Sequence, residues 1–241
     1  RAVATTLADL ETPGAGDQDV KVIVQIDRSS KGPADGYGYD NSNGDWYDTR
    51  RGEVVQDNDP VAIKYEHWDT LGEVNMGDPN ELKAFIAWGQ EHYPAEHYAV
   101  VLWNHGSGWD PFDDAQHTRA ICYDDASHDW IRIAEIPAAV QGRYPIDILA
   151  ADACLMAMLE VAYELRYSAD FYVASEALEP SEGYEYRNML APLVSANGNM
   201  TAEAFAKLIS EEAVDAWPYD EVTSSTVDLR KIGAVASALD G

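Results

Sequence analysis

Segments that favour strands alternate with segments that favour helices along most of this chain, and several of the strand segments are apolar throughout. The expected strands are Val20–Asp27, Val61–Tyr65, Tyr98–Trp103, Ala120–Tyr123, Ile146–Ala151, Phe171–Ser175 and Val222–Val227. Strands that are apolar on both faces are typical of a parallel sheet that is covered on both sides by helices. The sequence therefore predicts an α/β/α sandwich with a mostly parallel central sheet, formed by residues 1–241 as a single domain.

Two chemically distinctive loops follow two of these strands. His105 and Gly106 come just after Tyr98–Trp103, and Cys154 comes just after Ile146–Ala151. In open α/β sheets the functional crevice lies beyond the carboxyl ends of the strands, so we expect both loops at that edge. A helix-forming run begins directly after the cysteine, and a helix N-terminus stabilises a thiolate.

The chain is strongly acidic, with 43 Asp and Glu residues against 16 Lys and Arg residues and a formal net charge of −27. This balance argues against nucleic acid or an anionic membrane as a partner. It suits a basic substrate, a divalent cation such as Ca²⁺, or life in high salt. No apolar run approaches the 18 residues of a membrane span, and two cysteines form neither a disulfide scaffold nor a zinc site.

His105 precedes Cys154 by 49 residues. A cysteine peptidase needs a thiolate, a histidine within hydrogen-bond reach and donors for an oxyanion. Any α/β protein can place a histidine and a cysteine at this interval, so the spacing alone leaves a structural histidine and an inert buried cysteine as the alternative.

The residues that flank His105 and Cys154 are more specific than the spacing. The stretches Tyr98–Trp109 and Asp152–Met158 together resemble the clostripain family of caspase-like cysteine peptidases, peptidase family C11. The similarity continues in Asn75–Pro79, Ile121–Asp125 and Ala174–Tyr184. It implies a caspase-like fold for the sandwich. Family members begin with a strand ahead of the first helix, and because this chain lacks it we expect a truncated or fragmentary form.

The resemblance also implies residue roles. Cys154 is the expected nucleophile, His105 the proton acceptor, and the backbone N–H groups of Gly106 and Cys154 the oxyanion donors. Relatives cleave after Arg or Lys, so a carboxylate is expected in the first pocket. Asp152 is the first candidate and Glu182 the second. The alternatives are that Asp152 caps the following helix and that Glu182 is merely solvated.

Relatives are often activated by self-cleavage between the histidine and the cysteine, which here predicts a cut after Arg119. The resemblance further favours a secreted monomer that acts on peptides or proteins with basic residues. We expect that the chemistry needs no cofactor. Ca²⁺ is a candidate activator, and the sequence shows no recognisable set of metal ligands.

Two other functions stay open: a catalytically silent module that binds basic peptides, and a metal-dependent hydrolase that uses Asp124 and Asp125.

Overall fold

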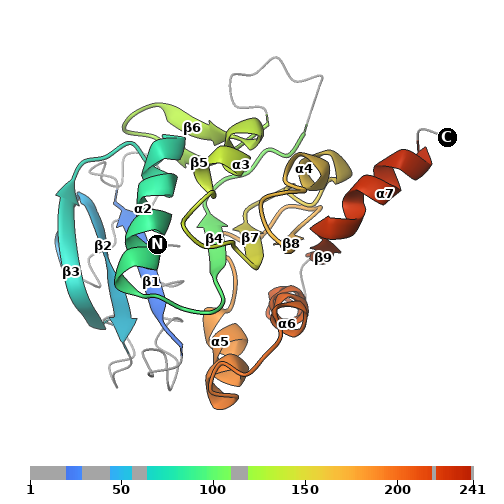
Figure 1. Cartoon of the computed structure of the whole chain (residues 1–241). Coiled ribbons are helices and arrows are strands. Elements are labelled where there is room, and N and C mark those ends of the chain that lie inside the picture. The colour runs from blue at the N-terminus through green and yellow to red at the C-terminus, as the bar shows by residue number, and fades with distance from the viewer. Residues whose placement is uncertain (1–19, 29–43, 56–63, 110–118, 219–220, 240–241) are drawn as a thin grey trace. The chain divides into compact units, whose positions relative to one another are not determined.

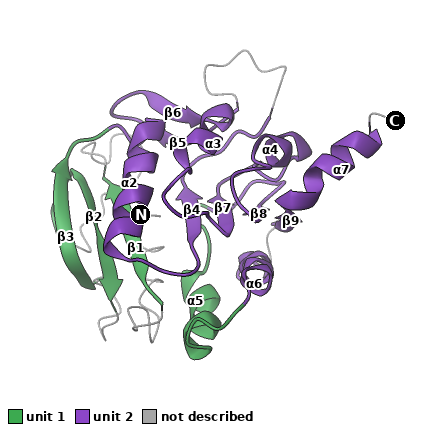
Figure 2. Ribbon diagram, in the orientation of Figure 1, with its two compact units in different colours: residues 1–74, 181–200 green, residues 75–180, 201–241 purple. Residues whose placement is uncertain are grey.

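The computed structural model describes residues 20–28, 44–55, 64–109, 119–218 and 221–239 of the chain (Figure 1). They fall into two compact units (Figure 2): residues 1–74 with 181–200, and residues 75–180 with 201–241. The pattern of residues 1–12 favours an amphipathic helix, and these residues lie outside the described part of the chain. None of the described helices is long and apolar enough to cross a membrane.

The first unit contains a three-stranded antiparallel sheet in the order β1-β2-β3. Its elements are β1 (Val22–Asp27), β2 (Thr49–Val55), β3 (Lys64–Gly72) and the helix α5 (Tyr186–Ser195). A small core of Ile26, Trp46 and Val54 holds it together. The stretch from residue 29 to Gly52 is rich in Gly, Asp, Asn and Tyr, which predicts a long surface loop. The strand β2 nevertheless begins at Thr49, because it pairs with a strand on each side and Thr49 is fully buried.

The second unit contains a four-stranded sheet in the order β4-β7-β8-β9. Its strands are β4 (Ala99–Trp103), β7 (Ile148–Asp152), β8 (Phe171–Ala174) and β9 (Ser225–Asp228). The first three run parallel and β9 runs antiparallel to β8. The predicted mostly parallel sheet is therefore confirmed for this unit, whereas the first unit's sheet is antiparallel.

Helices cover both faces of the four-stranded sheet, with α4 on one side and α6 on the other (Figure 1). The helices of this unit are α2 (Pro79–His92), α4 (Leu159–Glu164), α6 (Ala202–Asp215) and α7 (Leu229–Leu239). Local chemistry fixes two of their starts. The side chain of Asp78 accepts a hydrogen bond from the Asn80 N–H, and that of Thr201 accepts one from the Ala204 N–H.

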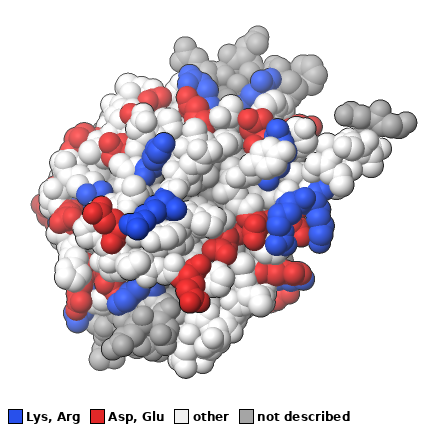
Figure 3. Space-filling view, in the orientation of Figure 1, with Lys and Arg blue, Asp and Glu red and all other residues white. Residues whose placement is uncertain are grey.

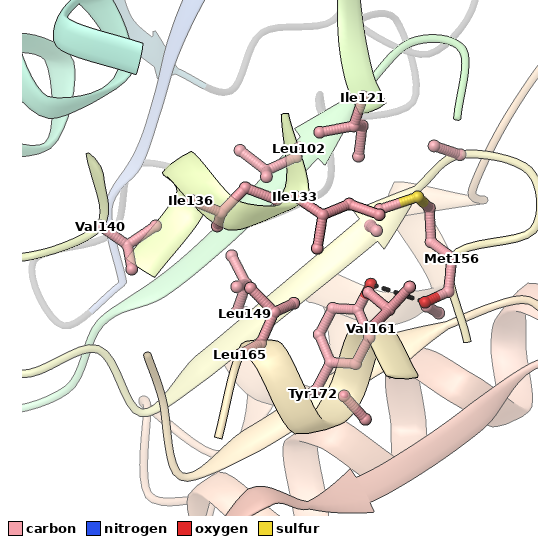
Figure 4. Close-up of a cluster of buried hydrophobic side chains, with 14 of the residues drawn as sticks. Leu102, Ile121, Ile133, Ile136, Val140, Leu149, Met156, Val161, Leu165 and Tyr172 are labelled. Atoms are coloured by element: carbon pink, nitrogen blue, oxygen red, sulfur yellow. Dashed lines mark hydrogen bonds between the residues drawn. The ribbon is translucent and has the colours of Figure 1, made fainter. Parts of the chain in front are cut away.

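A single apolar cluster fills the space between this sheet and its helices (Figure 4). Its members come from strands, helices and the turn after β7, and the largest include Ile121, Ile133, Ile136, Leu149, Met156, Leu165 and Tyr172. The hydroxyl of Tyr172 donates a hydrogen bond of 3.0 Å to the Met156 carbonyl, which satisfies both groups within the core. The turn after β7 is thus built into the core.

A hairpin and the loop before α2 are joined by a buried carboxylate. The hairpin consists of β5 (Ala120–Asp124) and β6 (Asp129–Arg132), followed by η2 (Ile133–Glu135) and α3 (Ile136–Ala139). Asp124 at the end of β5 is 5% exposed and accepts hydrogen bonds from the N–H groups of Met76 and Ser127 at 2.8 Å each. These bonds give Asp124 a structural role.

On the face shown in Figure 3, Asp and Glu side chains lie among Lys and Arg side chains and do not gather in one patch. The acids of this face are therefore solvated charges, which interact weakly with any single partner.

Replacing Asp124 by Ala should lower the free energy of unfolding by about 2–4 kcal/mol, because two partly buried N–H groups lose their acceptor. Asp125, next along the chain, is exposed, and Asp125→Ala should change it by less than about 0.5 kcal/mol. Urea unfolding with and without EDTA measures both. Stability of wild type that falls on addition of EDTA would contradict the structural reading of Asp124.

Candidate functional site

The register between β4 and β7 places the two predicted catalytic residues at corresponding positions. Trp103 lies opposite Asp152 in this parallel pair, and both strands end there. His105 and Cys154 each follow two residues later. The Asn104 N–H also donates to the Asp152 carbonyl at 3.4 Å, beyond the last paired residues. The two loops therefore leave the carboxyl edge side by side, as the sequence predicted.

The loop after β4 lies directly against the loop after β7. A Cβ atom added to Gly106 would lie 2.6 Å from the Cys154 carbonyl oxygen and 2.9 Å from Cγ of Met156. Gly108, at a φ of +58°, approaches the Leu155 carbonyl oxygen in the same way. These glycines are required because the two loops pack backbone to backbone. The missing side chain of Gly106 thus makes room for Cys154 and Met156.

Cys154 lies in a turn, and the prediction that a helix begins directly after it was wrong. The helix α4 begins at Leu159, five residues after the cysteine. In between, Leu155 takes a left-handed φ of 63°, and the N–H groups of Leu155 and Ala157 donate to the carbonyls of Ala177 and Ser175. Hydrogen bonds to the segment after β8 therefore override the helix propensity of this run, and the helix dipole does not act at the thiol.

The sulfur of Cys154 is held by the backbone of Glu179. The Glu179 N–H lies 3.2 Å from Sγ, and the Glu179 carbonyl oxygen lies 3.9 Å from it. The first contact is an N–H donor to sulfur. The segment after β8 thus holds the sulfur at the place where the sequence predicted a helix N-terminus.

Two carboxyl groups interact with each other near the thiol. Asp152, the last residue of β7, is 2% exposed, and the side chain of Glu179 reaches it. The two carboxyl groups form a hydrogen bond when they share a proton, whereas as a carboxylate neither buried Glu179 oxygen has a donor among the described residues. Burial, the charge of Asp152 and this hydrogen bond together raise the pKa of Glu179 well above the ordinary value. The cap of α4 is Met158 and receives no side-chain hydrogen bond, so the alternative that Asp152 caps the helix is wrong.

Glu179 is the residue of this group that sequence reasoning missed. The only signal is an acidic residue that follows the apolar pair Ala177-Leu178 and precedes Pro180 in a loop that also contains exposed acids. Glu182, the second carboxylate predicted for the first pocket after Asp152, is exposed and accepts a hydrogen bond from Ser181 Oγ. Glu182 belongs to the first compact unit and Asp152 to the second, so the role of Glu182 stays a prediction.

The loop that carries His105 is fixed by β5. The Cys122 N–H donates to the His105 carbonyl at 3.2 Å, and the Ser107 N–H donates to the Ala120 carbonyl at 3.1 Å. The imidazole is exposed, with its ring edge-on to Tyr123 at 6.1 Å between centroids. The ring is therefore accessible to an incoming substrate.

The N–H groups of Gly106 and Cys154 are available as donors. Within the described part of the chain, neither donates a hydrogen bond to a protein acceptor. Both lie in backbone segments that other hydrogen bonds hold in place. Fixed, unused N–H groups beside a thiol match what an oxyanion needs.

The second cysteine has the opposite environment. Cys122 packs against the apolar core, and burial raises the pKa of its thiol to about 12. It therefore remains protonated at neutral pH and is a poor nucleophile. Its place against the core gives Cys122 a packing role.

Replacing Gly106 by Ala should lower the free energy of unfolding by about 1–3 kcal/mol, because the new methyl group meets backbone and core atoms. Gly233 in α7 has no atom within 4 Å of an added Cβ, and Gly233→Ala should raise stability by about 0.5–1 kcal/mol. Urea unfolding of both variants tests the contact. Equal effects of the two substitutions would contradict it.

Comparison with known proteins agrees with this geometry. The sequence model of the Clostripain family matches residues 7–241. Clostripain from Hathewaya histolytica is 31% identical over 202 residues, which are 70% of this chain and 38% of that protein.

Two solved structures share the fold. One is a secreted C11 cysteine protease from Bacteroides thetaiotaomicron in complex with an irreversible peptide inhibitor, with a TM-score of 0.70, 20% identity and coverage of 98% of this chain and 63% of that one. The other is an inactive zymogen C11 protease from Parabacteroides distasonis, with a TM-score of 0.67, 20% identity and coverage of 98% and 58%. The chain spans less than two thirds of the length of each of these relatives. Because the family model covers nearly the whole chain and the fold agrees, this protein belongs to the clostripain family and has its caspase-like architecture.

Proposed function

We propose that this chain is the catalytic part of a cysteine endopeptidase that cleaves peptide bonds after basic residues. The observation that carries the proposal is the register of β4 and β7, which sends His105 and Cys154 out of the same sheet edge at corresponding positions. Membership in the clostripain family supports the same reaction class.

The chemistry uses both residues in turn. The Cys154 thiolate attacks the substrate carbonyl carbon, and the N–H groups of Gly106 and Cys154 donate to the oxygen as it becomes negative. His105, which has taken the thiol proton, gives it to the leaving amine. It then deprotonates a water that hydrolyses the thioester and restores the thiol.

A dyad fits the surroundings of the histidine better than a triad. The Asn104 side chain, the nearest candidate in sequence for a third member, accepts a hydrogen bond of 2.6 Å from the His105 N–H of the backbone. That bond occupies its oxygen and does not orient the imidazole. Orientation of the ring then depends on the backbone of the loop that β5 holds.

The specificity proposal rests on Asp152. A buried carboxylate two residues before the nucleophile can form a desolvated ion pair with an Arg or Lys side chain, and such a pair is much less screened by salt than one at the surface. Arg has the advantage because its guanidinium binds a carboxylate through two parallel hydrogen bonds.

Cleavage of peptides with Arg, Lys or Asp before a reporter bond tests the function. We expect cleavage after Arg and less after Lys, blocked by iodoacetamide and lowered by at least about 10³-fold in Cys154→Ala and His105→Ala. Cys122→Ala is the matched control and should retain activity. Binding of the Arg peptide without cleavage would instead support the silent module, and loss of turnover in EDTA would reveal dependence on Ca²⁺.

Self-cleavage after Arg119 is the regulatory part of the proposal. The Arg119 carbonyl accepts a hydrogen bond from the Ile133 N–H at 2.9 Å, and the Ala120 N–H donates to Ser107 Oγ at 3.1 Å. Both sides of this peptide bond are therefore engaged, and β5 must open locally before the bond can enter an active site.

Mass spectrometry of purified protein should find a new N-terminus at Ala120. It should be absent in Cys154→Ala and in Arg119→Ala, and present in Arg132→Ala, whose arginine lies at the end of β6. Because β5 must open first, its formation should be slower than turnover of a peptide substrate. An intact chain with full peptidase activity would contradict the self-cleavage proposal and leave the peptidase proposal standing.

A further inference from the structure

Glu179 makes two contacts at the proposed site, one through its backbone and one through its side chain. Its N–H donates to Cys154 Sγ at 3.2 Å, and its carboxyl group meets that of Asp152. Both Glu179 carboxyl oxygens are buried, and neither has a hydrogen-bond donor among the residues that the structure describes. The side chain is therefore anchored at the Asp152 carboxyl group.

A hydrogen bond between two carboxyl groups requires a proton on one of them, since two carboxylates have only acceptors. The titratable groups that act on Glu179 are Asp152 at the end of β7, Cys154 in the turn and Tyr172 on β8, and each of them is neutral or negative. With no cation acting on Glu179 among the described residues, the neighbours favour retention of a proton by the pair.

We propose that Glu179 is a positioning residue for Cys154: a proton shared with Asp152 fixes the Glu179 side chain, and this anchor holds its N–H against the sulfur. The proposal rests on the proposed role of Cys154 as nucleophile. It gives the pair Asp152–Glu179 a single negative charge at neutral pH. A second charge so close to the sulfur would oppose the thiolate, so the shared proton also favours reactivity.

The pH dependence follows from the direction of the shift. The pKa of Glu179 is raised in the folded chain, so between its ordinary value and the raised value the folded state binds more protons than the unfolded state. Stability therefore falls as pH rises through this window, by up to tenfold in the unfolding equilibrium constant per pH unit. Below the ordinary value of a glutamate the difference vanishes.

Glu179→Gln and Glu179→Ala separate the two parts of the proposal. The Gln amide can donate to the Asp152 carboxylate as the protonated Glu does, whereas Ala removes the anchor. At pH 7 we expect Cys154 in Glu179→Gln to react with iodoacetamide within about threefold of wild type, and in Glu179→Ala at least about tenfold more slowly, as for a lost hydrogen bond to a charged group. Glu176→Gln, an exposed residue of the same loop, is the matched control and should match wild type.

A second readout is independent of the thiol. Carbon-13 NMR of labelled carboxyl groups should show one carboxyl that stays protonated at pH 7 in wild type and in Glu176→Gln, and that is missing in Glu179→Gln. With rising pH, the stability of wild type should fall relative to that of Glu179→Gln. Above the raised pKa, the alkylation rate of wild type should also fall below that of Glu179→Gln.

Three results would overturn the proposal: alkylation of folded Glu179→Ala at the wild-type rate, equal losses in the Gln and Ala variants, or ordinary titration of every carboxyl group. If Glu179→Ala fails to fold, the titration and the alkaline comparison with Glu179→Gln still decide. Alkylation and NMR do not depend on peptidase activity. A chain that shows the expected thiol and carboxyl behaviour but cleaves no peptide would refute the proposed function and leave the Glu179–Asp152 pair intact.

Discussion

The parallel pairing of β4 with β7 is the constraint on which the candidate site depends. Because Trp103 lies opposite Asp152, each loop leaves the sheet at the same level, and the Asn104 N–H continues the contact past the last pair. A shift of the register by one residue would turn every side chain of one strand to the other face. The buried apolar residues on both faces of β7 oppose such a shift, so the core also fixes the position of the site.

The thiol gains its environment from three turns of backbone and not from a helix. The loop after β4 supplies Gly106, the turn after β7 supplies the sulfur, and the segment after β8 supplies the Glu179 N–H. Hydrogen bonds from Leu155 and Ala157 to that last segment hold the turn open where a helix would otherwise begin. Loops tied to neighbouring strands in this way position groups more rigidly than surface loops, which suits a site that must stay preorganised.

The sequence predicted what depends on short-range patterns. The apolar strands before His105 and Cys154 were found where expected. The side-chain caps at Asp78 and Thr201 also follow from local residue types, because Asp and Thr favour helix starts. The start of α4 and the role of Glu179 depend instead on contacts between segments some 20 to 25 residues apart, such as the Leu155 N–H with the Ala177 carbonyl. Helix propensity is a weak preference that such tertiary hydrogen bonds override, and an acid within an acidic chain gives no sign that it is buried.

The net charge of −27 and the carboxyl pair of the site act on different scales. Surface acids interspersed with Lys and Arg are screened within about 8 Å at physiological salt, so they guide a cationic partner only over short distances. Asp152 is 2% exposed and is screened far less. Two buried charges would be costly to hold side by side, whereas one charge shared through a proton is less costly and still complements one basic side chain. Under the proposed specificity, discrimination between basic and neutral substrates depends on this single buried charge, and the acidity of the surface contributes mainly to the rate of encounter.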